Sequence, residues 1–125
     1  MRQSVLVVDD DRGAREIMTT CLCLDGFNGI ATANGLEALT YLRSGGSADV
    51  ILLDLRMPVM NGFDFREQQL LDPILAAIPV VIMTGEVDVS VLTLRPAAWF
   101  EKPVDVDQII GRVRDLVLQK TQAST

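Results

Sequence analysis

Short apolar runs alternate with amphipathic segments along the whole chain. Five runs rich in β-branched and aliphatic residues are predicted as strands, over 4–9, 27–33, 48–54, 79–84 and 97–101. The segments between them carry apolar residues at helical spacing, although 86–94 fits neither period clearly. Continuous apolar strands separated by amphipathic helices predict an α/β three-layer sandwich, with a five-stranded parallel sheet between two layers of five helices in total.

The same pattern predicts which residues of each helix face the core. They are Ala14, Ile17, Met18, Cys21 and Leu22 in the first helix, Leu36, Leu39 and Leu42 in the second, and Val106, Ile109, Ile110, Val113, Leu116 and Val117 in the last. Asn34 and Asp105 are predicted to cap the second and last helices. Cys21 and Cys23 are interpreted as ordinary helix residues, because their spacing does not suit a metal site.

Length and charge limit the classes of protein that remain. The 125 residues suit a single domain over 1–125, with a core over about 4–120 and a polar tail over 121–125. The net charge is −6 and no basic run is present, so direct binding to nucleic acid is not expected. The longest apolar stretch is too short to span a membrane, and the N-terminus carries acids where a signal peptide would be apolar. A cytoplasmic location is therefore expected.

Polar residues follow four of the five predicted strands. They are Asp9, Asp10 and Asp11 at the end of the first, Asp54 at the end of the third, Thr84 at the end of the fourth and Lys102 after the fifth. The carboxyl ends of parallel strands meet at one edge, so these side chains are expected to converge. Clustered carboxylates attract a hard cation such as Mg²⁺, whereas a lysine and a threonine suit phosphoryl oxygens. Because an aspartate can itself accept a phosphoryl group, the set indicates phosphoryl transfer to an aspartate.

Each of these residues also has a purely structural interpretation. The acids after the first strand suit the N-terminus of a helix, and Asp54 suits the cap of the following turn. Thr84 is an ordinary β-branched strand residue, and Lys102 an ordinary surface lysine. These readings do not explain why all of the residues stand at the ends of strands, and this coincidence favours a shared site.

The chain from Ser4 to about Lys120 resembles the response-regulator receiver domain of two-component signalling. The resemblance rests on the motifs VLVVDDD, LLDLRMPVMNG, PVVIMTG and WFEKP. It implies the flavodoxin-like, doubly wound fold of CheY-like proteins, and a signalling domain rather than an enzyme. The implied partner is a sensor histidine kinase or a histidine phosphotransfer protein, since this chain has no histidine of its own.

The resemblance also implies a role for each residue of the site. Asp54 is the expected phospho-acceptor, with Lys102 and Thr84 contacting the phosphoryl oxygens. The expected ligands of Mg²⁺ are Asp9, Asp10, Asp54 and the backbone carbonyl of Arg56. The peptide bond between Lys102 and Pro103 is expected to be cis.

Further residues are expected to tune the switch. Trp99 stands where the family has a switch aromatic, and Arg56 and Glu86 stand where residues flank the acyl phosphate and tune its hydrolysis. Lys102 follows Thr84 by only 18 positions, and Arg95-Pro96 lies between them, so the fourth helix is predicted to be short or irregular. The resemblance leaves room for a homodimer through residues 86–118. Val91, Leu92, Leu94 and Trp99 suit either that interface or the core, with the core favoured for most of them.

Two alternatives differ in class from a phosphorylatable switch. A haloacid-dehalogenase-type phosphotransferase also uses Asp, Thr or Ser, Lys and Mg²⁺. It normally has an Asp-x-Asp nucleophile motif on its first strand and a cap, whereas Asp54 is on the third predicted strand and the chain leaves no room for a cap. The other alternative is a non-phosphorylated receiver-like interaction module, which the complete set of acids, threonine and lysine disfavours.

Overall fold

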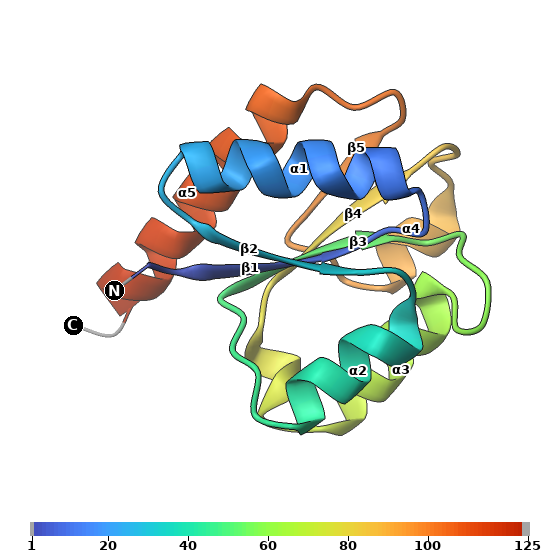
Figure 1. Ribbon diagram of the computed structural model, residues 1–125. Helices are drawn as coiled ribbons and strands as arrows, with labels where there is room; N and C mark the ends of the chain where they lie inside the picture. Colours follow the sequence, from blue (N-terminus) through green and yellow to red (C-terminus); the bar gives the residue numbers. More distant parts are fainter. Residues whose placement is uncertain (1, 124–125) are drawn as a thin grey trace.

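A single parallel sheet forms the middle of the molecule. The computed structural model describes residues 2–123 (Figure 1). The strands are β1 (Ser4–Val8), β2 (Asn28–Thr32), β3 (Val50–Asp54), β4 (Val80–Thr84) and β5 (Ala98–Glu101), in the order β2-β1-β3-β4-β5. All neighbouring strands are parallel. The predicted strands and the predicted fold class are therefore confirmed.

Helices cover both faces of this sheet. They are α1 (Arg12–Leu24), α2 (Gly35–Arg43), α3 (Gly62–Leu71), α4 (Val89–Thr93) and α5 (Val106–Ala123), with a 3-10 turn, η1 (Leu75–Ala77), before β4. α1 and α5 pack on one face, and α2 and α3 on the other (Figure 1). Asn34 caps α2 and Asp105 caps α5, as predicted. The fourth helix has only five residues, so the predicted shortening is also confirmed.

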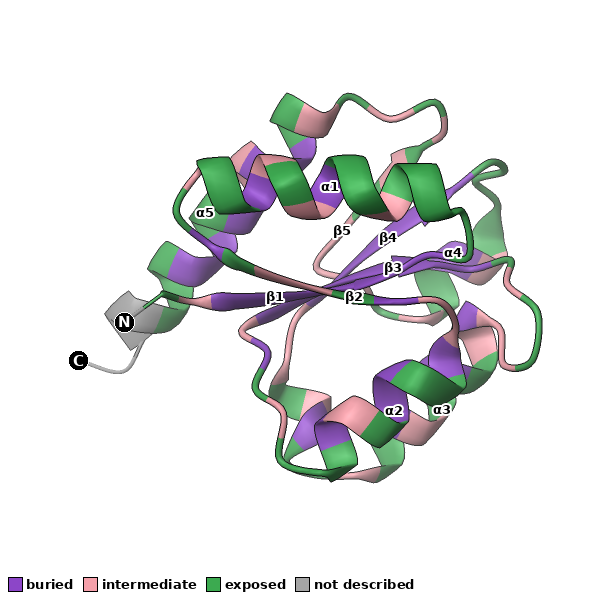
Figure 2. Ribbon diagram, viewed as in Figure 1, coloured by how far each residue is buried: buried purple, intermediate pink, exposed green. Residues whose placement is uncertain are grey.

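Burial on both faces explains why the central strands are continuously apolar. Every residue of β1, β3 and β4 is buried, and the strands divide the core into two apolar clusters (Figure 2). One cluster lies against α1 and α5, and the other lies against α2, α3 and α4. Each fully buried aliphatic side chain contributes about 1.5–3 kcal/mol. The sheet therefore forms a rigid platform whose carboxyl edge carries the polar strand ends.

The predicted inner faces of α1 and α2 were partly wrong. Leu36 is 49% exposed, because the buried stripe of α2 is formed by Gly35, Ala38, Leu39 and Leu42, and Leu36 lies one position off it. Ala14 and Ile17 are also exposed, whereas Met18 and Leu22 are buried. Ala14 and Ile17 instead line a surface cavity near the start of the helix. The predicted inner face of α5 is confirmed for the five residues from Ile109 to Val117, and Val106 is half-buried.

The segment after β4 divides between core and surface. Val91 is buried, and Leu94 packs against the core formed with α2 and α3. Leu92 and Trp99 are exposed, so two of these four residues belong to the core rather than most of them. Among the described helices, none is long and apolar enough to cross a bilayer.

Candidate functional site

The order of the strands brings two acids to the centre of the carboxyl edge. β1 and β3 are neighbours, and Val8 pairs with Leu53, so the next residues, Asp9 and Asp54, lie side by side at the ends of the two strands. The sheet reverses its winding between these two strands, which is where ligands bind in open α/β sheets. A carboxylate oxygen from each of Asp9, Asp10 and Asp54 lies within 4.8 Å of the others. Asp9 and Asp54 are buried and Asp10 is exposed, so the cluster opens to solvent on one side.

The three consecutive acids after β1 do not share one role. Asp11 is the N-cap of α1, and its Oδ1 accepts a hydrogen bond from the Ala14 N–H at 3.0 Å. The Asp11 N–H in turn donates to Asp9 Oδ1, also at 3.0 Å. The helix-terminus interpretation is thus correct for Asp11. Asp9 and Asp10 remain to form the acid cluster with Asp54.

Lys102 supplies a positive charge to this cluster. Its Nζ lies 3.0 Å from Asp54 Oδ2 and 3.8 Å from Asp9 Oδ2. The Lys102 N–H donates to the Thr84 carbonyl at 2.7 Å, which extends the β4–β5 pairing beyond β5. The peptide bond between Lys102 and Pro103 is cis. The backbone therefore holds the lysine side chain over the same edge as the acids.

Burial and charge act in opposite directions on these groups. Burial lowers the pKa of Lys102, but the hydrogen bond to Asp54 and the fields of the acids outweigh it, so the pKa lies above its usual value. Burial raises the pKa of Asp9, and the charges of Asp54 and Asp10 add to this effect, so the pKa lies above its usual value although the Asp11 N–H and Lys102 lower it. A buried acid that resists ionisation gains most from a cation placed beside it. Arg15 contacts the same turn, donating from Nη1 to the Asp9 carbonyl at 2.8 Å.

An ion pair joins the loops after β3 and β4, and the first of these loops also contacts Asp54. Arg56 Nη2 and Glu86 Oε2 form an exposed ion pair at 3.1 Å, and the Arg56 N–H donates to Asp54 Oδ1 at 3.3 Å. The Thr84 hydroxyl donates to the Glu86 carbonyl at 3.2 Å. Both loops are thereby linked to the residue that ends β3. Trp99 lies farther along the edge strand β5, where it is 46% exposed.

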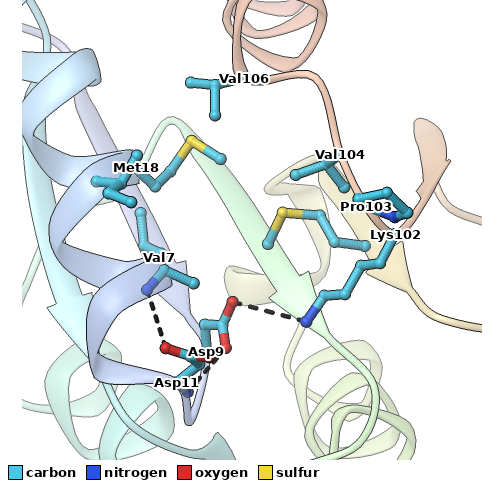
Figure 3. A pocket seen from close by; sticks show the side chains of 11 residues that line it. Val7, Asp9, Asp11, Met18, Lys102, Pro103, Val104 and Val106 are labelled. Atoms are coloured by element: carbon cyan, nitrogen blue, oxygen red, sulfur yellow. Dashed lines mark hydrogen bonds and ion pairs between the residues drawn. The ribbon is translucent and has the colours of Figure 1, made fainter.

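A cavity of about 270 Å³ opens beside the acids, between α1 and the segment after β5 (Figure 3). Its lining is mostly apolar and includes Val7, Met18, Met83, Val104 and Val106. Asp9, Asp11 and Lys102 lie at its polar end. The sequence did not predict this cavity. The apolar residues that line it follow the same pattern as core residues, so nothing in the pattern indicated a gap between α1 and the segment after β5.

The donor set fits a hard divalent cation. Three carboxylates offer oxygen ligands only, and one of them is exposed, which leaves room for water or phosphoryl oxygens in the same coordination shell. Mg²⁺ is usually bound in this way, through a few carboxylates while it keeps several waters.

Together, the strand order and the edge of acids and lysine define a CheY-like α/β domain. A model of the response regulator receiver domain matches residues 5–114. The chain belongs to this family, and is therefore a receiver domain of the response regulators of two-component signalling.

Relatives and solved structures agree with this assignment. The DNA-binding response regulator MtrA of Mycobacterium tuberculosis is 36% identical over 118 residues, which are 91% of this chain and 50% of MtrA. Sporulation initiation phosphotransferase F of Bacillus subtilis is 32% identical over 119 residues, which are 91% of this chain and 93% of that protein. The structure of a response regulator receiver protein from Pseudomonas putida has a TM-score of 0.85 at 28% identity, covering 92% of this chain and 98% of that one. The chain spans about half the length of MtrA.

Proposed function

We propose that this receiver domain is a phosphorylatable switch that accepts a phosphoryl group on Asp54. The observation that carries the proposal is the 3.0 Å contact between Lys102 Nζ and Asp54 Oδ2, inside a cluster of three carboxylates at the sheet edge. Asp54 is thus a nucleophile placed beside a fixed positive charge. Asp9, Asp10, Asp54 and the Arg56 carbonyl are the proposed ligands of Mg²⁺, which would neutralise charge on the phosphoryl oxygens.

The proposed donor is the phosphohistidine of a sensor histidine kinase or of a histidine phosphotransfer protein. A carboxylate oxygen of Asp54 attacks phosphorus, the phosphorus–nitrogen bond breaks, and the imidazole leaves with the electron pair. Asp54 loses its negative charge as the new bond forms, and the Lys102 ammonium then pairs with an oxygen of the transferred phosphoryl group. Such catalysis consists of positioning and electrostatics, so the partner protein need only deliver the phosphoryl group.

The proposed response begins at Thr84. Its hydroxyl is held by the Glu86 backbone, one residue past the loop glycine, and can exchange that partner for a phosphoryl oxygen on Asp54. The segment after Thr84 would then change its position, because the hydroxyl no longer fixes the loop. The covalent modification thereby biases a two-state equilibrium of the surface that follows β4.

Acetyl phosphate provides a direct test without a partner protein. Intact mass of the protein incubated with acetyl phosphate is expected to show one phosphoryl adduct in the presence of Mg²⁺. After removal of Mg²⁺ with a chelator, the adduct is expected to disappear, since three carboxylates would otherwise repel the incoming phosphate. An adduct that forms equally well without the metal would contradict the proposed site, and so would two or more adducts.

The Arg56–Glu86 ion pair is proposed to slow hydrolysis of the phosphorylated form. The two side chains join the loops that begin after Asp54 and Thr84, and we propose that they obstruct the water that attacks the acyl phosphate. An Arg56→Ala, Glu86→Ala double variant is expected to lose its phosphoryl group severalfold faster than the wild type. Decay of the adduct after removal of acetyl phosphate measures the rate. Equal or slower decay in the double variant would refute the proposal, and the two single variants report whether the residues act as a pair.

A further inference from the structure

A buried arginine on α3 contacts the end of α4. Arg66 is only 5% exposed. Its Nε donates to the Leu94 carbonyl at 2.9 Å, its Nη2 donates to the Arg95 carbonyl at 3.0 Å, and its Nη1 donates to Gln69 Oε1 at 2.8 Å. Among the described residues, its side chain forms no ion pair with a carboxylate. Burial lowers the pKa of Arg66, yet a guanidinium stays protonated in proteins. The buried positive charge is therefore stabilised by neutral carbonyl and amide oxygens.

Gln69 links Arg66 to the turn that follows α3. It is fully buried, and its Nε2 donates to the carbonyls of Leu75 and Ile78, at 2.8 and 3.1 Å. The two side chains therefore join the turn before β4 to the turn after α4. Removing one member of such a network leaves buried partners unsatisfied, which makes the network rigid as long as it is complete.

The connection that Arg66 holds has little structure of its own. α4 has five residues, and a helix this short is not stable through its own hydrogen bonds. Leu94 is its C-cap, and the next residue, Arg95, has a φ of 52°, which is unfavourable for a residue with a Cβ. Both carbonyls that accept from Arg66 lie in this turn. A cation at the last carbonyls of a helix is a favourable cap.

A second arginine holds the same connection from the opposite face of the sheet. Arg112 on α5 donates from Nη2 to the Ala97 carbonyl at 3.3 Å. The Ala97 N–H donates to the Val80 carbonyl at 2.8 Å, where β5 begins to pair with β4. Residues 94–97 are thus fixed from both layers of helices. The segment between Thr84 and α4 has no comparable set of buried side-chain contacts among the described residues.

We propose that Arg66 is a positioning residue that anchors the α4–β5 connection, so that a change at Thr84 moves the segment of residues 85–93 and leaves the backbone of residues 94–100 in place. The second half of this inference rests on the proposed phosphorylation of Asp54. The anchor fixes which part of the surface after β4 can respond. In a chain with so short a fourth helix, it takes the place of the helical turns that would otherwise hold this connection.

Amide hydrogen exchange tests the anchor in the resting protein. In Arg66→Met, the amides of Leu94, Arg95 and Ala97 are expected to exchange about tenfold faster or more, because two carbonyls of the turn lose their donors. Exchange in β1 and β3 should stay as in the wild type. Arg43→Met is the matched control, since Arg43 is exposed on α2 and, among the described residues, its side chain forms one hydrogen bond, to Gln68 at 3.4 Å. Unchanged exchange at the three amides, or a uniform increase across the sheet, would overturn the inference.

A second arm adds Mg²⁺ and beryllofluoride as a phosphoryl-like probe. In the wild type, changes in exchange are expected over 85–93 and not over 94–100, whereas in Arg66→Met they should extend into 94–100. A wild-type response that already spans 94–100 would overturn the inference. If Arg66→Met fails to fold, Arg66→Lys is judged by the same criteria, because it keeps the charge but cannot reach both carbonyls and the amide. Absence of any wild-type response would count against the proposed function, while the resting-state comparison still decides whether the anchor exists.

Discussion

Replacing Gly62 with alanine is expected to destabilise the protein by about 3 kcal/mol, at the upper end of what overpacking usually costs. Gly62 is the first residue of α3, and its N–H donates to the Leu55 carbonyl at 2.9 Å. A Cβ at this position would lie 2.5 Å from the Asp54 carbonyl oxygen and 2.7 Å from Leu55 Cα. Both neighbours are backbone atoms at the end of β3 and cannot move aside as a flexible side chain would. The strain therefore falls on the residue proposed to accept the phosphoryl group.

Urea unfolding followed by circular dichroism measures this effect, with Gly111→Ala as the control. A Cβ on Gly111, within α5, would meet no atom within 4 Å apart from the nearby backbone of its own helix. That variant is expected to gain up to about 1 kcal/mol, because alanine favours a helix over glycine. A free energy of unfolding for Gly62→Ala within about 0.5 kcal/mol of the wild-type value is typical of an ordinary surface substitution, and it would contradict the close approach of α3 to β3.

Lys102→Met is expected to slow formation of the phosphoryl adduct by about a hundredfold, the usual effect of removing one preorganised donor from a reacting oxyanion. Methionine keeps most of the volume of the side chain but removes the ammonium that lies 3.0 Å from Asp54. The affinity for Mg²⁺ should stay the same or increase, because the ammonium repels a cation that binds to the same acids. A slower reaction combined with unchanged or tighter metal binding separates a role in catalysis from damage to the site.

Lys120→Ala is the matched control for this variant. Lys120 is the other lysine of the chain, and it forms an exposed ion pair with Asp49 at 3.0 Å. Surface pairs of this kind contribute little, so its rate of adduct formation should equal that of the wild type. If Lys102→Met formed the adduct at the wild-type rate, Lys102 would have no part in the transfer, and its contact with Asp54 would be structural.

Periodicity sufficed to predict the sheet because strands buried on both faces have a continuous apolar pattern. It also located the edge residues, since Asp54 and Thr84 end strands that are otherwise apolar. The rule that parallel strands end at the same edge then placed Asp9, Asp10 and Lys102 with them. The pattern did not separate Asp11 from its neighbours, because an N-cap and an acid cluster call for the same residue type. That distinction depends on the hydrogen bond from the Ala14 N–H.

Other features could not be predicted because they depend on tertiary contacts. Arg66 and Gln69 are polar residues on the buried side of α3, so a pattern of apolar positions places them outside the core. Their burial becomes favourable only because carbonyls from distant turns face them. Leu36 shows the opposite case, an apolar residue at the start of α2 that lies one position away from the buried stripe. The short α4 was predicted from its length in sequence, but not the arginines that hold its end.

Identifying the modified residue tests the central claim most directly. The phosphorylated protein would be reduced with borohydride, which converts an aspartyl phosphate into homoserine, and then digested with trypsin. Cleavage after Arg43 and Arg56 gives peptide 44–56, which contains Asp49 and Asp54, and fragmentation distinguishes the two. We expect homoserine at position 54 only, dependent on Mg²⁺ and absent from Asp54→Asn. Homoserine at position 49 or in another peptide, or an unmodified peptide 44–56 from a protein that carries the phosphoryl group, would contradict the assignment of Asp54 as the acceptor.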